Sequence, residues 1–148
     1  MTIYFGTDHA GLELKNTLLA FVRDELGYAV EDCGAYEMNA EDDYPDFVKT
    51  VATAVAENPE NVRGIVLGGS GQGEAMCANR ATGVRAALYY GGSTDIVRLS
   101  REHNDANVLS LGARCMSAEE AREAVQVWLT TEFSGDERHV RRITKLDV

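Results

Sequence analysis

The chain has 148 residues, of which 45% are apolar, so it is long enough for one ordinary domain with its own core. Its formal net charge of −10 disfavours nucleic acid and anionic membranes as partners. The apolar runs are too short to span a bilayer, and the first residues lack the features of a signal peptide, so we expect a cytoplasmic protein. The three cysteines are widely spaced without a Cys-x-x-Cys pair, which predicts free thiols rather than a zinc site.

Hydrophobic periodicity predicts strands that alternate with helices along the chain. Strands of this kind joined by helices form right-handed crossovers and a parallel sheet. We therefore predict an α/β fold over residues 1–148 as a single domain: a Rossmann-like, three-layer αβα sandwich with a five-stranded parallel sheet. The expected strands cover residues 2–7, 28–33, 64–67, 84–89 and 108–111, and the expected helices cover residues 12–26, 46–57, 74–81, 94–103, 118–131 and 137–146.

Three polar segments directly follow predicted strands, namely Asp8-His9, Gly68–Gly73 and Gly112–Arg114. In a parallel sheet the carboxyl ends of the strands lie at one edge, and ligands bind beyond that edge. We therefore expect the three segments to meet in one site.

The segment Arg63–Asn79 carries the most informative pattern, because a short apolar run ends in four glycines within six residues and a helix is predicted to follow. A strand, a glycine turn and a helix N-terminus present backbone N–H groups to an anion. Single residues exclude three better-known loops. A Walker loop would need lysine where Glu74 stands, a hydrolase elbow would need glycine at Gln72, and the dinucleotide spacing is one residue short.

Glu74 places a carboxylate where an anion would otherwise bind. The helix macrodipole alone favours a glutamate at this position and would also keep it ionised. However, a loop that stabilises a developing oxyanion while a base removes a proton needs both the N–H groups and a carboxylate. We interpret Glu74 as a general base.

Other polar residues have plain structural alternatives. Asp8 is a possible helix N-cap beside an incidental histidine, and the polar run Arg101–Asn107 is typical of a surface turn. A metal site built from Asp8, His9 and His103 lacks any ligand spacing, so we do not expect a metal ion there.

The segment Arg138–Lys145 holds 4 of the chain's 14 Lys and Arg residues. Arg138 and Arg142 are four positions apart and share one helix face, where they would grip a phosphate by charge-assisted hydrogen bonds. The alternative is a solvated basic helix end.

Together these segments resemble the RpiB/LacAB family of sugar-phosphate isomerases. One departure concerns the base: many members carry a cysteine directly before the Gly-Thr/Ser-Gly segment, where this chain has Gly68. The chain resembles instead the subgroup with a glutamate after that segment, and Cys77 does not occupy the family's cysteine position. The matching motifs run in family order over nearly the whole chain: Gly6-Thr-Asp-His-Ala-Gly11 with Leu14-Lys15, Asp43-Tyr-Pro-Asp46, Gly64–Asn79, Gly83-Val-Arg-Ala-Ala87, Arg101–Val108, Leu111–Arg114 and Arg138-His-x-x-Arg142.

The resemblance implies an aldose–ketose isomerase that needs no metal or organic cofactor. In this scheme His103 opens the furanose ring, Glu74 moves the C2 proton to C1 through a cis-enediolate, and Asp8 shuttles protons between O1 and O2. The remaining implied roles are an anion hole from Ser70 with Gly69, Gly71, Gln72 and Gly73, phosphate binding by His9, Arg138 and Arg142, and completion of the pocket by Asn104 and Arg114.

The expected reaction is conversion of ribose 5-phosphate to ribulose 5-phosphate. Another phosphosugar (allose 6-phosphate, galactose 6-phosphate or a tetrose phosphate) and a non-catalytic sugar-phosphate-binding subunit are the alternatives, because one sequence does not set pocket depth. Family members are dimers or tetramers of dimers, so we expect a homodimer or a larger assembly with shared active sites. On that analogy His103, Asn104 and Arg114 act across the interface.

Overall fold

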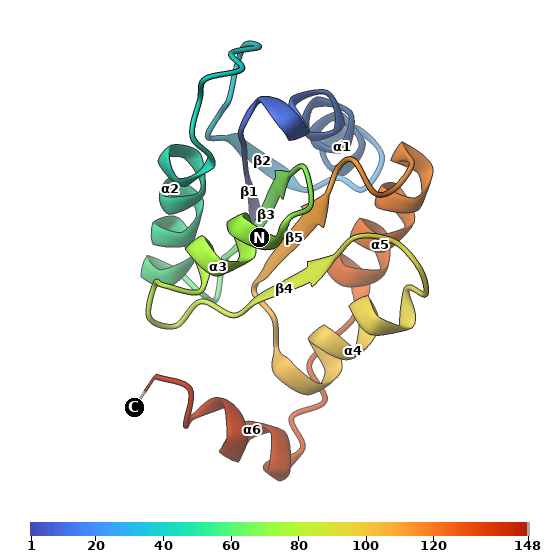
Figure 1. Ribbon diagram of the computed structural model, residues 1–148. Helices are drawn as coiled ribbons and strands as arrows, with labels where there is room; N and C mark the ends of the chain where they lie inside the picture. The colour runs from blue at the N-terminus through green and yellow to red at the C-terminus, as the bar shows by residue number, and fades with distance from the viewer. Residues whose placement is uncertain (148) are drawn as a thin grey trace.

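Five parallel strands form the centre of the structure, a computed structural model that describes residues 1–147. The strands lie in the order β2-β1-β3-β5-β4, so the last strand of the chain is inserted between β3 and β4 (Figure 1). The predicted α/β fold with a five-stranded parallel sheet is confirmed. The strands are β1 (Thr2–Thr7), β2 (Ala29–Asp32), β3 (Val62–Gly68), β4 (Ala86–Tyr89) and β5 (Val108–Gly112), and the helices are α1 (Leu12–Asp24), α2 (Tyr44–Glu57), α3 (Gln72–Ala78), α4 (Asp95–Asn104), α5 (Ala118–Thr130) and α6 (Glu137–Ile143).

Helices cover both faces of the sheet, because successive strand residues point to opposite sides. Ile65 and Leu67 pack with α1, α4 and α5 around Trp128, whereas Val66 of the same strand packs with α2 and α3 around Val51. Helix α6 lies outside these layers and packs against α4 (Figure 1). None of the helices within residues 1–147 combines the length and hydropathy required to cross a bilayer.

Some helices begin at other residues than the hydrophobic periodicity predicts, because proline and glycine determine where they start. Helix α2 begins at Tyr44, two residues earlier than predicted, because Pro45 in its first turn already has a helical φ and needs no N–H donor. Helix α3 begins at Gln72 rather than Glu74, directly after Gly71, whose φ of 76° is left-handed. A 3-10 helix at His9–Gly11 was not predicted, since three residues leave no periodic pattern.

Candidate active site

The carboxyl ends of β1, β3 and β5 bring the three polar segments together, as predicted. Thr7 of β1 pairs in register with Leu67 of β3, and the Thr7 hydroxyl donates to the Leu67 carbonyl at 2.8 Å. The loop after β5 holds the glycine loop by two backbone hydrogen bonds. The N–H of Ala113 donates to Gly68 at 2.8 Å, and that of Arg114 donates to Gly69 at 3.0 Å.

The glycine loop is fixed at its turn and open at its tip. The Ser110 hydroxyl is fully buried and donates to the Gly71 carbonyl at 2.6 Å. At the exposed tip, the Ser70 hydroxyl accepts the Gln72 N–H at 3.3 Å, and Gly73 follows in the first turn of α3. The loop thus presents the Ser70 hydroxyl and backbone groups at a surface that a small ligand can reach.

Glu74 lies in the first turn of α3 and is only 4% exposed. Burial raises the pKa of its carboxyl group, and the nearby negative charge of Asp8 raises it further. The backbone interaction at the helix start lowers the pKa of Glu74, as the dipole argument expects, but desolvation has the larger effect. A carboxyl group of raised pKa is better suited to accept a proton near neutral pH.

Asp8 is a helix N-cap, the structural role considered above, and it also lies at the site. Its side chain caps the 3-10 helix by accepting the Ala10 N–H at 3.0 Å. It is only 8% exposed, and its charge acts on Glu74. The cap fixes the Asp8 carboxylate at a position from which its charge reaches Glu74.

His9 is held by Asp42, a residue that sequence reasoning did not single out. Asp42 Oδ1 lies 2.6 Å from His9 Nδ1 and accepts the His9 backbone N–H at 3.1 Å. Possible ligand atoms of Asp8, His9 and Asp42 lie within 4.8 Å of one another. Among the described residues, these three form the cluster that could hold a metal ion. Without a metal, the His9 ring contacts Asp42 and the Asp8 side chain accepts the Ala10 N–H, so both side chains have partners within the protein.

Arg114 and Cys115 lie beside the glycine loop, and Cys77 lies on α3. A side chain added at Gly69 would lie 3.3 Å from Arg114 Nη1, so this exposed guanidinium is beside the loop of its own chain. Burial raises the pKa of the Cys77 thiol, which therefore stays protonated near neutral pH. Cys115 is exposed, with Sγ 3.9 Å from the Gly69 carbonyl oxygen.

His103 and Asn104 lie at the opposite edge of the sheet. Helix α4 starts after the carboxyl end of β4 and ends just before the amino end of β5, where Arg85 Nε donates to the Asn104 carbonyl at 3.1 Å. A strand of five residues, such as β5, spans roughly 15 Å. His103 and Asn104 are thus separated from Glu74 of the same chain by about the length of the sheet.

The basic helix α6 extends from that same far edge. The rings of His103 and His139 stack with centroids 4.4 Å apart and planes 14° apart, and burial, followed by the charge of His103, lowers the pKa of His139. Arg138 and Arg142 are exposed. The structure therefore groups the predicted residues into two sets, one at each edge of the sheet.

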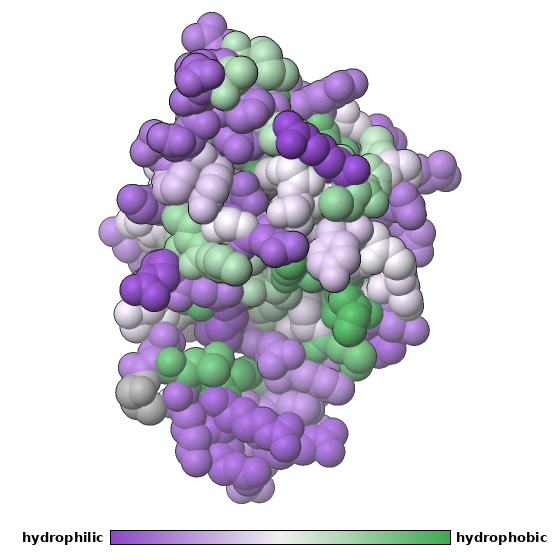
Figure 2. All heavy atoms as spheres, in the orientation of Figure 1, coloured by the Kyte–Doolittle hydropathy of each residue, from purple (hydrophilic) through white to green (hydrophobic). Residues whose placement is uncertain are grey.

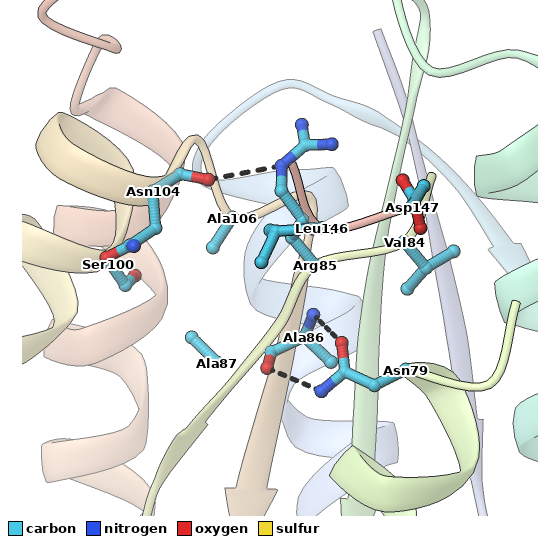
Figure 3. Close-up of a pocket in the computed structure, with 10 residues that line it drawn as sticks. All are labelled: Asn79, Val84, Arg85, Ala86, Ala87, Ser100, Asn104, Ala106, Leu146 and Asp147. Atoms are coloured by element: carbon cyan, nitrogen blue, oxygen red, sulfur yellow. Dashed lines mark hydrogen bonds between the residues drawn. The ribbon is translucent and has the colours of Figure 1, made fainter. Parts of the chain in front are cut away.

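An open cavity of about 510 Å³ lies beside Asn104, between α3, the edge strand β4, α4 and the C-terminal residues (Figure 3). The Asn79 side chain satisfies backbone groups on the outer side of the edge strand β4. Its Oδ1 accepts the Ala86 N–H at 2.7 Å, and its Nδ2 donates to the Ala86 carbonyl at 3.1 Å (Figure 3). Leu146 lines the cavity and is 62% exposed, and hydrophobic atoms surface where α6 joins the body (Figure 2). Glu74 and Asp8 do not line this cavity.

A family model described as Ribose/Galactose Isomerase matches residues 3–146. This chain belongs to that family. It is 43% identical to ribose-5-phosphate isomerase B of Mycolicibacterium paratuberculosis, over 97% of this chain and 87% of the relative. The crystal structure of ribose-5-phosphate isomerase B from Mycoplasma genitalium with bound ribulose-5-phosphate has a TM-score of 0.91 at 38% identity, covering 98% of this chain and 93% of that one. The enzyme of the same name from Thermotoga maritima has a TM-score of 0.90 at 42% identity, covering 99% and 97%.

The structure explains why this chain has a glycine at position 68, the position of the cysteine described above. A Cβ added at Gly68 would lie 1.9 Å from Glu74 Oε1 and 2.1 Å from its carboxyl carbon. The Glu74 carboxylate therefore occupies the space that a side chain at position 68 would take. Gly68 and Glu74 are a matched pair, and either a side chain at position 68 or the glutamate fits there.

This overlap predicts that Gly68→Ala displaces the Glu74 carboxylate without unfolding the chain, because the clash is with the end of a flexible side chain. Misplacement of a reacting group by about 1 Å can cost about 10²-fold in rate, so the role of base that the sequence predicts for Glu74 implies a loss of that order in kcat. Steady-state kinetics and a thermal unfolding midpoint measure the two effects separately. An unchanged kcat would contradict the role of this contact.

Proposed function

We infer that this chain interconverts D-ribose 5-phosphate and D-ribulose 5-phosphate through a cis-enediolate. The names of the relatives support the reaction, and the ribulose-5-phosphate held by a structure of the same fold supports the substrate class. The observation that carries the proposal is the buried Glu74 carboxylate beside Asp8 and the glycine loop. An isomerase needs a base, a second proton carrier and an oxyanion site within reach of two adjacent carbons, and this edge of the sheet offers all three.

Glu74 removes the proton from C2 of the open-chain aldose and returns it to C1. The electrons of the C2–H bond form the C1–C2 double bond of the enediolate, and negative charge develops on O1. Asp8 moves the hydroxyl proton between O2 and O1, so that C2 becomes the ketone and C1 the alcohol. The raised pKa of Glu74 supports this cycle, because Glu74 must keep the proton that it takes from C2 until it transfers that proton to C1.

The glycine loop stabilises the enediolate oxygen. The Ser70 hydroxyl and the N–H groups of Gly69–Gly73 donate to the developing charge, and their buried support by Ser110 keeps them in place before the reaction. His103 transfers the proton that opens the furanose ring.

Two copies of the chain share each active site. His103, Asn104, Arg138 and Arg142 belong to the far edge of the sheet, whereas proton transfer requires contacts of roughly 3 Å. A two-fold dimer that sets the α6 end of one copy against the glycine loop of the other forms two identical sites. The exposed Met76, Tyr90 and Leu146 and the open cavity beside Asn104 support a partner on this side of the molecule.

The phosphate lies between His9 of one copy and the two arginines on α6 of the other, with Arg114 beside the loop. Arg142→Ala is expected to raise KM for ribose 5-phosphate by roughly 10- to 100-fold with a much smaller change in kcat, because a charge-assisted bond contributes about 1.5–3 kcal/mol. Arg141→Ala is the matched control, since Arg141 is also exposed but lies on a different face of α6. Equal KM values for the two variants would refute the assignment of Arg142.

The direct test is ketose formation by the purified chain with ribose 5-phosphate, with and without a chelator. We expect turnover in both conditions. No turnover with ribose 5-phosphate but activity with allose 6-phosphate, galactose 6-phosphate or a tetrose phosphate would move the substrate within the same reaction class. Binding without turnover of any of these sugars would indicate a sugar-phosphate-binding subunit.

A further inference from the structure

Asp42 joins a loop far along the chain to the site. It is 33 residues from His9 in the sequence and belongs to the segment between β2 and α2. One oxygen, Oδ1, makes both contacts with His9, at 2.6 Å to the ring Nδ1 and at 3.1 Å to the backbone N–H. This double contact fixes both the position of His9 and the rotation of its ring.

The two partners of the Asp42–His9 contact differ in burial. The Asp42 side chain is 9% exposed and that of His9 is 26% exposed, so the carboxylate lies beneath the imidazole. The other oxygen, Oδ2, is buried and has no hydrogen-bond partner among residues 1–147. A buried carboxylate with an unpaired oxygen is costly, so the two contacts that Oδ1 makes with His9 are the polar contacts that hold the Asp42 side chain in place.

The bond to Nδ1 also determines what the rest of the ring can do. A neutral histidine with its proton on Nδ1 presents only an acceptor at Nε2, and an acceptor repels a phosphate oxygen. When both nitrogens carry protons, the ring donates to Asp42 on one side and to an anion on the other. The ring therefore donates to a phosphate through Nε2, while Nδ1 contacts Asp42, only when both nitrogens carry protons.

We propose that Asp42 is the positioning residue of the phosphate-binding His9, which it holds in orientation and supplies with a counter-charge. The proposal rests on the proposed function, since it assigns a partner to one of the phosphate ligands of that site. Asp42 does not touch substrate. It acts through His9, so that the phosphate completes a chain of alternating charge from carboxylate to imidazolium to phosphate.

The first test is kinetic. Asp42→Asn keeps the size of the side chain and removes its charge, and we expect KM for ribose 5-phosphate to rise about tenfold while kcat changes less than about twofold. Glu41→Gln is the matched control: it removes the same charge from the neighbouring residue, which is exposed, whereas among residues 1–147 the His9 ring Nδ1 and backbone N–H bond to Asp42. Unchanged KM in an active Asp42→Asn enzyme would overturn the proposal, whereas an inactive wild-type enzyme would overturn the proposed function.

The second test separates action through His9 from a general structural effect. In a double-mutant cycle with His9→Gln, Asp42→Asn is expected to cause no additional rise in KM, because its route to the phosphate is already lost. Independent, additive effects would overturn the proposal.

The third readout does not depend on catalysis. In ¹⁵N-histidine NMR spectra with inorganic phosphate as the probe, we expect phosphate to shift the ring-nitrogen signals of His9 in the wild type and to bind more weakly to Asp42→Asn. If the wild type loses activity with a chelator and regains it with a divalent cation, Asp8, His9 and Asp42 would be metal ligands instead, and the proposal would be wrong.

Discussion

Glu74→Gln is expected to lower kcat by about 10²–10⁴, the usual contribution of a positioned general base. The amide has nearly the same size and fits the same space over Gly68, but it does not accept the C2 proton. Steady-state kinetics with ribose 5-phosphate measure the loss, and KM should change little because Glu74 is not assigned to the phosphate. Near-normal kcat in this variant would transfer the search for the base to Cys77.

The fold itself is not at risk in this experiment. Because the folded-state pKa of Glu74 is raised, the folded protein binds more protons than the unfolded chain as the pH rises above the ordinary value of 4.5, so ionisation of Glu74 lowers stability at neutral pH. Glu74→Gln removes that cost. The variant should therefore unfold at the same temperature as the wild type or higher, and a lower midpoint would show that the carboxylate has a structural role.

The pH dependence of kcat/KM provides a further check on the same residue. The base must be ionised to act, so activity is lost as the pH falls through its pKa. Since burial and Asp8 raise that pKa, the acid limb of the profile should lie above pH 4.5. In Glu74→Gln the residual activity should lack this limb. An acid limb at the ordinary glutamate value would contradict the raised pKa.

Mixing two inactive variants should restore activity if the sites are shared. In a mixed dimer of Glu74→Gln and His103→Gln, one site contains both defects and the other contains neither. Equal random mixing makes half of the dimers mixed, so specific activity should recover to about one quarter of the wild-type value in a two-fold dimer. Co-expression followed by an assay of the unfractionated mixture measures this recovery, and the isolated mixed dimers should show about half of the wild-type activity.

The matched control pairs two residues from the same edge of the sheet. A mixture of Glu74→Gln with Asp8→Asn should not recover activity. Both residues of a site come from the same copy, so each site of a mixed dimer lacks one of them. No recovery in the first mixture, once mixed dimers are detected by mass, would show that His103 does not act across the interface. Recovery in the control would show that Glu74 and Asp8 of one site come from different copies.

The fold followed from local patterns with few corrections. Each predicted strand and helix is present within residues 1–147, because apolar spacing reports which face of an element is buried. The early start of α2 depended on Pro45, and the early start of α3 on the left-handed Gly71. The strand order was not predictable in this way, since the insertion of β5 between β3 and β4 depends on pairing between distant strands.

For the site, the sequence by itself determined which segments end at the carboxyl edge of the sheet and that Glu74 follows a glycine turn, because both depend on neighbours along the chain. Tertiary structure alone decided the rest. Burial raised the pKa of Glu74 against the expected effect of the dipole, the Glu74 carboxylate filled the space over Gly68, and Asp42 reached His9 across 33 residues. The return of α4 across the sheet also carried His103 to the far edge. Desolvation and contacts between distant segments arise only when the chain packs, so no local pattern encodes them.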